Sequence, residues 1–419
     1  MIEVGADDMK NYLLKVKLCG MKGIDQEIAI SFYHKRVGKD FDAEDDRIKA
    51  IYGENGSGKT AILTSLQVLK NVVFNHYYLK QDQTQNILHE IINKKTKTFK
   101  IEMELWHRKD AKHSNVYRYK LVLSLDPFDH YCIRYESLEV KNGNTPTNQY
   151  KRLFEVNDGH INFVRLPSLD AKVLEEKTRN LLNFQSVLSL DQSIQLEEKL
   201  SKNAFHDHLS AMRSSLLAIH IALEDNTSSS KYPMIQDQFI VNKEDYQAFQ
   251  IYVQQLYNFI TVFKRDLTNI RIENHENKET YHCELFFVYP DYNVGFPYEC
   301  SAVKRLVKLY SYLIDVDHGD IVLIDDLDLH LNSVYLMMLI DYFICYGQGQ
   351  LCMTMHNTMP MAVLKRNKRA IDFITSQGMH SWVPHGNANP ENCYRMGLID
   401  GLPSHVEAKD FLGMFDANK

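Results

Sequence analysis

The sequence feature that most constrains this chain is a glycine-rich run of eight residues, Gly53-Glu54-Asn55-Gly56-Ser57-Gly58-Lys59-Thr60. A short, mostly apolar run at 48–52 precedes it, and apolar residues at helical spacing follow it over 61–73. Glycines between a strand and a helix let successive backbone N–H groups point at phosphate oxygens, and the helix adds the positive end of its dipole. The run therefore predicts a P-loop in an α/β fold.

The last two residues of the run carry the charge and the metal-binding hydroxyl that a nucleotide triphosphate requires. Lys59 is expected to face the β- and γ-phosphates of ATP, and the Thr60 hydroxyl is expected to bind Mg²⁺. We therefore predict that residues 53–60 together bind ATP. A chance glycine turn is the alternative interpretation, and the flanking strand and helix argue against it.

Two later strands are predicted to end in polar residues that complete this site. Ile321 to Ile324 is a fully apolar run, as in a central parallel strand, and Asp325 and Asp326 follow it directly. We expect Asp325 on the magnesium side and Asp326 in position to orient the attacking water. A solvated acidic turn is the alternative. A further short strand ends near His356, which we expect to sense the γ-phosphate, although most single histidines are ordinary surface or core residues.

The composition excludes several other classes of protein. A length of 419 residues, with 44% hydrophobic and 24% charged residues, favours a globular chain of two or three domains. The net charge of −6 gives no global sign of nucleic-acid binding. Seven cysteines without a CxxC pair disfavour a zinc site or a disulfide framework. No run of about 18 apolar residues occurs, so we expect no membrane span and a cytoplasmic protein.

The pattern of apolar residues divides the chain into three parts. Residues 1–169 are predicted to form an N-terminal ATPase lobe that holds the P-loop and a β-rich subdomain. Residues 170–268 read as a helical insertion or arm. Residues 269–419 are predicted to form a C-terminal ATPase lobe that holds the acidic strand end and His356.

The order of these motifs resembles the ABC/SMC-like ATPases with a RecF-like head, and most of all the single-head ATPases of prokaryotic antiphage-defence and abortive-infection systems. The acidic segment 324–331 is similar to the family's acidic motif. The segment 299–306 is similar to its signature motif, and 394–403 to its C-terminal stretch. The resemblance covers nearly the whole chain.

The resemblance implies a fold, ligands and an assembly. It implies an α/β head of the ABC/SMC type with a β-subdomain and an inserted helical arm, which binds ATP and Mg²⁺ and hydrolyses ATP. By position, Asp325 would bind magnesium through water, Asp326 would stand at the general-base position, and His356 would be the switch histidine. Ser301 would contact the γ-phosphate held by a second subunit, which implies a homo-oligomer, at least a head-to-tail dimer with two composite sites.

Two departures from the family pattern predict slow hydrolysis. Asp326 stands where glutamate is usual, and Ala302 replaces the signature glycine. Our leading hypothesis is a nucleotide-gated switch subunit of an antiviral defence system, acting on an effector protein encoded nearby. One alternative is a RecF/SMC-like DNA-repair ATPase, which would bind nucleic acid. An ATPase of a nuclease of the overcoming-lysogenization-defect type is less favoured, because only 63 residues follow His356.

Overall fold

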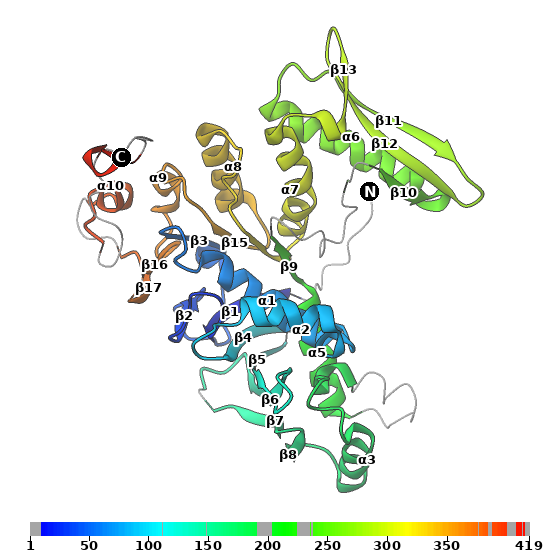
Figure 1. Cartoon of the computed structure of the whole chain (residues 1–419), viewed down its shortest axis with the longest axis vertical. Coiled ribbons are helices and arrows are strands. Elements are labelled where there is room, and N and C mark those ends of the chain that lie inside the picture. Colours follow the sequence, from blue (N-terminus) through cyan, green and yellow to red (C-terminus); the bar gives the residue numbers. More distant parts are fainter. Residues whose placement is uncertain are drawn as a thin grey trace.

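The computed structural model describes residues 10–110, 112–147, 149–190, 203–223, 235, 238–375, 377–383, 388–399, 408–412 and 414. Within them the chain forms a parallel-type sheet, a larger antiparallel sheet below it and a small sheet at the far end of the molecule (Figure 1). The predicted α/β fold with a β-subdomain is confirmed.

The central sheet is parallel except at one edge. Its strands follow the order β17 (Gly378–Ser381), β16 (Ile371–Thr375), β3 (Ile48–Gly53), β15 (Gln350–Thr354), β14 (Ile321–Ile324) and β9 (Ile219–Ala222). Only β17 runs antiparallel to its neighbour. All residues of β3, β14 and β15 are buried, as expected for parallel strands that are covered on both faces.

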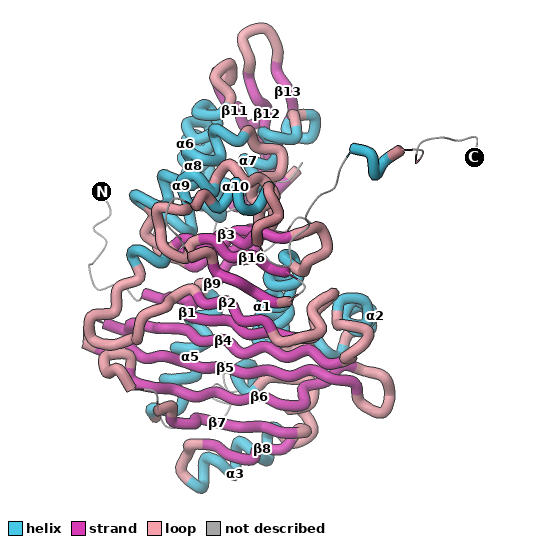
Figure 2. The backbone as a smooth tube through the Cα atoms, turned by 90° about the vertical axis from the view of Figure 1, so that its left-hand side faces the viewer, coloured by secondary structure: helices cyan, strands magenta, loops and turns pink. Residues whose placement is uncertain are grey.

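The second sheet is antiparallel throughout and forms the broad ladder of Figure 2. Its order is β2 (Ile28–Ser31), β1 (Lys10–Cys19), β4 (Thr98–Asp110), β5 (His113–Leu125), β6 (Tyr131–Asn142), β7 (Lys151–Asn157) and β8 (His160–Val164). Apolar and polar residues alternate along β4, so one face is buried and the other carries charged groups. This sheet confirms the β-rich subdomain that the sequence predicts.

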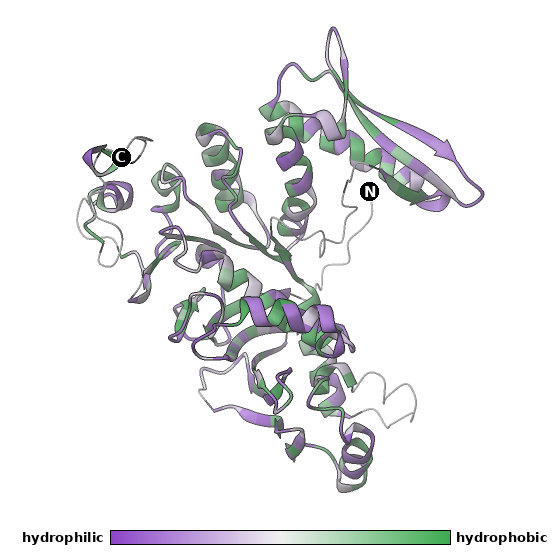
Figure 3. Ribbon diagram, viewed as in Figure 1, coloured by the Kyte–Doolittle hydropathy of each residue, from purple (hydrophilic) through white to green (hydrophobic). Residues whose placement is uncertain are grey.

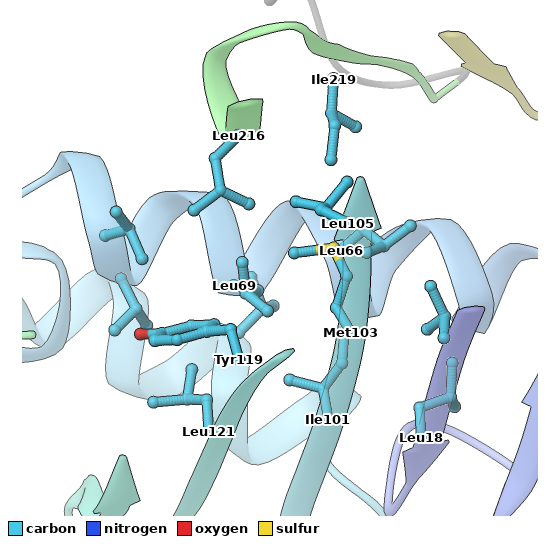
Figure 4. Close-up of a cluster of buried hydrophobic side chains, with 14 of the residues drawn as sticks. Leu18, Leu66, Leu69, Ile101, Met103, Leu105, Tyr119, Leu121, Leu216 and Ile219 are labelled. Carbon is cyan, nitrogen blue, oxygen red and sulfur yellow. The ribbon is translucent and has the colours of Figure 1, made fainter. Parts of the chain in front are cut away.

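Helix α1 (Lys59–Phe74) lies between these two sheets, which explains why apolar residues surround most of its circumference. Figure 4 shows Leu66 and Leu69 of α1 against Ile101 and Met103 of β4. Helices α2 (Asp82–Ile91), α3 (Ser168–Thr178) and α5 (Ala204–Leu217) accompany the antiparallel sheet. The helix that follows the P-loop is therefore buried in a hydrophobic core to which both sheets contribute.

The opposite face of the parallel sheet is covered by α7 (Ser301–Asp317), α8 (Ser333–Tyr346), α9 (Met361–Leu364) and α10 (Pro390–Arg395). A small sheet projects beyond α7. It contains β10 (Phe239–Asn242), β12 (Thr280–Val288), β11 (Asn269–Glu276) and β13 (Asn293–Gly295). Helix α6 (Tyr246–Phe263) packs between this sheet and α7. Short 3₁₀ segments lie at Glu44–Asp46, Tyr78–Lys80, Lys243–Asp245, Phe296–Tyr298 and Ala408–Phe411. None of the described helices has the length and apolar character that a membrane crossing requires.

The predicted helical insertion at 170–268 does not form one helical unit. Within its described residues, β9 joins the parallel sheet beside β14 and β10 joins the small sheet. The sequence hides β9 because its four residues continue the apolar spacing of α5 without a glycine or proline between them. Three consecutive serines at 228–230 predict a break in this region, but they lie outside the described residues.

A buried ion pair joins β3, the strand that leads into the P-loop, to β16. Lys49 Nζ lies 3.1 Å from Asp372 Oδ1 and donates a hydrogen bond of 2.6 Å to the carbonyl oxygen of Arg369. Both charged side chains are almost completely buried. Burial raises the pKa of the Asp372 carboxyl, and the Lys49 charge opposes this rise.

Removing one partner of this pair should destabilise the fold strongly. Lys49→Met is expected to lower the free energy of unfolding by about 3 kcal/mol near pH 8, because it leaves an uncompensated buried carboxylate. Without Lys49 the folded-state pKa of Asp372 rises further above its unfolded value. Stability is therefore lost as pH rises, and the variant should be more stable at pH 5 than at pH 8. Urea unfolding of Lys49→Met and of Lys49→Met/Asp372→Asn tests this, and equal stability of the two variants at pH 8 would contradict it.

Candidate functional site

The glycine-rich loop lies between β3 and α1, where the sequence places it. Gly56 and Gly58 have φ angles of 80° and 106°, a region that residues with side chains rarely adopt. A Cβ atom at Gly58 would also lie 2.8 Å from Ile24 Cγ1. The two glycines therefore allow a loop conformation that other residues would strain.

Two side chains of the loop point toward its interior. Lys59 Nζ donates hydrogen bonds to the carbonyl oxygens of Gly53 at 2.8 Å and Glu54 at 3.0 Å, so its amine lies across the loop. The Ser57 hydroxyl is buried and has no hydrogen-bond partner among the described residues. A buried polar atom without a partner is costly, and an oxygen of a bound phosphate would satisfy it. The loop therefore fits a phosphate ligand.

The end of β14 is fixed by groups on β15 and α7. The Thr354 hydroxyl donates a 2.6 Å hydrogen bond to Asp325 Oδ1 and accepts one of 2.8 Å from the backbone N–H of Asp326. The Arg305 guanidinium donates to the carbonyl oxygens of both aspartates, at 2.8 and 2.9 Å. Asp325 is buried, and its second carboxylate oxygen remains available to a ligand. Thr354 and Arg305 are site residues that sequence reasoning missed.

Asp326 and His356 are brought together at the edge of this site. His356 Nε2 lies 3.6 Å from Asp326 Oδ1. Burial, reinforced by the neighbouring charge of Asp325, raises the pKa of the Asp326 carboxyl, while His356 lowers it. Asp328 Oδ2 accepts hydrogen bonds from the backbone N–H groups of His356 and Asn357, at 3.0 and 2.6 Å, and so holds the histidine loop against the acidic turn.

The P-loop and the acidic turn face each other. Strand β15 lies between β3 and β14, and all three run parallel, so their carboxyl ends meet at one edge of the sheet. Burial lowers the pKa of Lys59, and the charges of Asp326, Asp325 and Asp328 oppose this shift. The structure therefore brings the predicted loop, both predicted carboxylates and the predicted histidine into one cluster.

Ser301 lies apart from this cluster. It is exposed at the first turn of α7, and no contact among the described residues links it to the P-loop. Hydrogen bonds hold the two residues before it, Glu299 and Cys300. The Tyr289 hydroxyl donates a 2.7 Å hydrogen bond to Glu299 Oε1, and Glu299 Oε2 accepts one of 3.0 Å from Cys300 N–H. Ser301 is therefore exposed at the start of a helix whose preceding residues are held by hydrogen bonds.

A cavity of about 360 Å³ opens beside the P-loop. The P-loop residues 54–57, the turn at 23–28 between β1 and β2, and the turn between β16 and β17 line it. Its polar side chains include Asp25, which accepts a 2.8 Å hydrogen bond from Lys95 Nζ, and Glu27. Sequence reasoning missed this cavity, because residues 23–28 carry no motif.

A second polar cluster lies inside the molecule, away from the P-loop. His220 Nε2 lies 3.2 Å from Asp320 Oδ2, and its Nδ1 lies 3.6 Å from Asp315 Oδ2. Each ring nitrogen faces a different carboxylate, and one ligand atom from each of the three side chains lies within 4.8 Å of the others, a spacing that could also hold a metal ion. Lys70 donates to the carbonyl oxygen of Ile219 beside them. This cluster joins β9 to α7.

Comparisons with known proteins give distant likenesses to solved structures. No protein-family model and no curated protein matches the chain. Among solved structures, the chain is similar to the Smc head domain of Pyrococcus furiosus, crystallised with an extended coiled coil and bound to the C-terminal domain of ScpA. The sequence identity is 13%, the match covers 89% of this chain and 96% of that chain, and the TM-score is 0.43.

The chain is also similar to RecF, the recombination mediator protein of the RecFOR pathway, in a structure with ATP. The identity is 11%, the coverage is 90% of this chain and 100% of RecF, and the TM-score is 0.37. A second RecF structure, with ATPrS, gives the same identity and coverage and a TM-score of 0.36. At this level of similarity the function has to be argued from the site itself.

Proposed function

We propose that this protein binds ATP with magnesium and hydrolyses it slowly, as the switch subunit of an antiviral defence system that controls a partner effector through nucleotide-dependent dimerisation. The observation that carries the ATP site is the placement of Lys59 and the P-loop opposite Asp325 and Asp326 at one edge of a parallel sheet. The defence role rests on the resemblance of the motif order described above.

The proposed roles follow from the donors that each group offers. The backbone N–H groups of residues 53–60, the Ser57 hydroxyl and the Lys59 amine would hold the phosphates. The Thr60 hydroxyl and the Asp325 carboxylate are the oxygen ligands that would hold Mg²⁺. When bound, that ion neutralises charge on the phosphate oxygens. The cavity beside the loop, with Asp25 and Glu27, would receive the nucleoside end through its hydroxyl and amino groups.

The proposed chemical step assigns Asp326 to the attacking water and His356 to the γ-phosphate. Asp326 O and N are both held by neighbours, so the carboxylate has little freedom to move forward. Aspartate is one methylene shorter than glutamate, which withdraws the carboxylate by roughly 1.5 Å, about one C–C bond. Misplacement of this size can cost about a hundredfold in rate. We therefore expect turnover below the usual enzyme median of about 10 s⁻¹.

The proposed dimer would place Ser301 of one copy at the P-loop of the other. The exposure of Ser301 at the start of α7 supports this, because a helix N-terminus favours negative charge and the first turn of α7 holds no acidic side chain. Arg305, one turn later, ties the same helix to the acidic turn. A nucleotide at the partner's P-loop that contacts Ser301 would therefore act, through α7, on the acidic turn of the chain that carries Ser301.

A mixing experiment tests the composite site. Lys59→Ala and Ser301→Arg are each expected to abolish ATP hydrolysis as homodimers. A one-to-one mixture should recover about one quarter of wild-type activity, because half of the dimers are mixed and each mixed dimer keeps one intact site. The matched control is Leu169→Arg, which places an arginine at another exposed position in the first turn of a helix and should leave activity unchanged.

Full activity of Ser301→Arg alone would show that one chain completes the site and would overturn the proposed dimer.

The proposed role in antiviral defence has a separate readout. A bacterial host that carries this chain with its neighbouring genes should resist phage infection, and the Lys59→Ala form of the chain should not protect it. Equal protection by both forms would contradict the switch function.

A further inference from the structure

A large hollow lies far from the P-loop, between α6, α7, α8 and β10. We call it the upper groove; its lining residues lie between 239 and 263 on β10 and α6, between 310 and 318 on and just after α7, and between 335 and 343 on α8. Its volume is about 1180 Å³. Pockets for small molecules usually measure about 300–1000 Å³, so the volume of the groove exceeds that of a usual small-molecule pocket.

Helix α8 presents an apolar stripe to solvent, and the middle two residues of the stripe, Met338 and Tyr342, line the groove. Val334, Met338, Tyr342 and Tyr346 follow one another at intervals of four residues, and each is between 45% and 67% exposed. Figure 3 shows hydrophobic colours along most of α8. A row with i, i+4 spacing is the ridge that one helix offers to another in helix–helix packing. This stripe therefore has the form of a helix face without its partner.

The α6 wall and β10 continue this surface. Ile251 and Val262 are 56% and 60% exposed and lie on one side of α6, and Ile240 of β10 is 62% exposed. Phe259 and Tyr310 stack at a centroid distance of 5.0 Å on the groove floor, between the walls. Exposed apolar side chains gathered in one hollow mark an interaction site more often than isolated ones do.

The permanently charged side chains that line the groove are acidic, and the lining also includes His318. The groove lining includes the carboxylates of Asp245 and Asp317, and no Lys or Arg side chain lines it among the described residues. Asp317 accepts a 3.1 Å hydrogen bond from the Tyr342 hydroxyl, and Asp245 accepts one of 3.2 Å from Asn242. Neither carboxylate forms an ion pair with a described residue. A basic partner would therefore be favoured, and an acidic one disfavoured.

This charge also disfavours a second copy of the chain as the occupant. In a two-fold contact the same patch faces itself, so Asp245 and Asp317 of both copies would enter one interface. Like charges placed together at an interface oppose association. A separate protein with positive charge has no such penalty.

We propose that the upper groove binds an amphipathic helix of a partner protein, with aliphatic or aromatic anchors at i, i+3, i+4 and i+7 spacing and lysines or arginines beside them. The anchors pack against the α8 stripe and α6, and the basic side chains lie near Asp245 and Asp317. The groove shares no residue with the P-loop cluster, so this inference does not depend on nucleotide binding.

The test uses the full chain and two synthetic probes. One is an 18-residue peptide with leucine and phenylalanine at the anchor positions and lysine elsewhere; the other has glutamate in place of lysine. Fluorescence anisotropy should show saturable binding of the lysine peptide, at least about tenfold tighter than that of the glutamate peptide. Met338→Ala/Tyr342→Ala should weaken the lysine peptide about tenfold, and Asp317→Asn should weaken it by a smaller factor that shrinks in high salt.

Phe128→Ala removes an exposed apolar side chain far along the chain from the groove and serves as the matched control, with unchanged peptide binding expected. Lys59→Ala should also bind the peptide normally, which separates this result from that of the ATP site. Three outcomes would overturn the proposal. The first is the absence of saturable binding, and the second is equal binding of both peptides. The third is a wild-type dimer, detected by light scattering, that Met338→Lys dissociates, because such a dimer would place a second copy of the chain in the groove.

Discussion

A Lys59→Ala variant is expected to bind ATP roughly 10- to 100-fold more weakly than the wild type, because it loses a charge-assisted hydrogen bond of about 1.5–3 kcal/mol. The same amine spans the loop through the carbonyl oxygens of Gly53 and Glu54, so the alanine variant also loses a constraint on the loop. Titration calorimetry with ATP and magnesium measures the affinity directly.

The matched control for this prediction is Lys80→Ala, at an exposed lysine of a short 3₁₀ segment. It should bind ATP as the wild type does. Thermal unfolding adds a second readout, because ATP at about 100 times its dissociation constant should stabilise the wild type by about 2.7 kcal/mol. Undiminished ATP affinity in Lys59→Ala would rule out the P-loop as the binding site.

Replacement of Asp326 should change the rate of hydrolysis in both directions. Asp326→Ala is expected to lower kcat by about 10²–10⁴, as for loss of a general base, with ATP affinity retained. Asp326→Glu extends the carboxylate by one methylene and should raise kcat about tenfold or more. The φ angle of Asp326 is 44°, so the glutamate variant should also be less stable by roughly 1 kcal/mol.

The pH dependence of hydrolysis is a second test of the proposed role of Asp326 as a general base. A general base acts when it is ionised, so activity is present above its pKa and is lost as pH falls through it. Burial and Asp325 raise the pKa of Asp326, and the acidic loss of kcat should therefore begin at a higher pH than for an ordinary aspartate. A wild-type kcat well above about 10 s⁻¹ without any partner would contradict the slow switch.

The sequence predicts those parts of the fold that depend on local pattern. Strand β14 coincides with the apolar run Ile321–Ile324, and α1 begins at Lys59 as the P-loop motif requires. The alternation along β4 predicts a half-buried strand. Strand β9 shows the limit of this reasoning, because a four-residue, mostly apolar segment beside a helix carries no signal of its own and only the neighbour β14 makes it a strand.

The candidate site likewise has residues that the sequence predicts and residues that it does not. The phosphate loop, Asp325, Asp326 and His356 are predictable because their types recur in a fixed order after strands. Thr354 and Arg305 were missed, since a threonine inside a strand and an arginine in a helix have many ordinary roles. Their function here depends on β15 lying beside β14 and on α7 crossing the acidic turn, which are long-range contacts.

The central claim is that ATP and magnesium bind between the P-loop and the end of β14. The most direct test is a structure of Asp326→Ala determined with ATP and Mg²⁺, since slow hydrolysis should preserve the nucleotide. We expect a triphosphate along residues 53–60 with its outer phosphates at Lys59, and an ion between Thr60 and Asp325. An empty loop at millimolar nucleotide, or a nucleotide bound elsewhere on the molecule, would contradict the account.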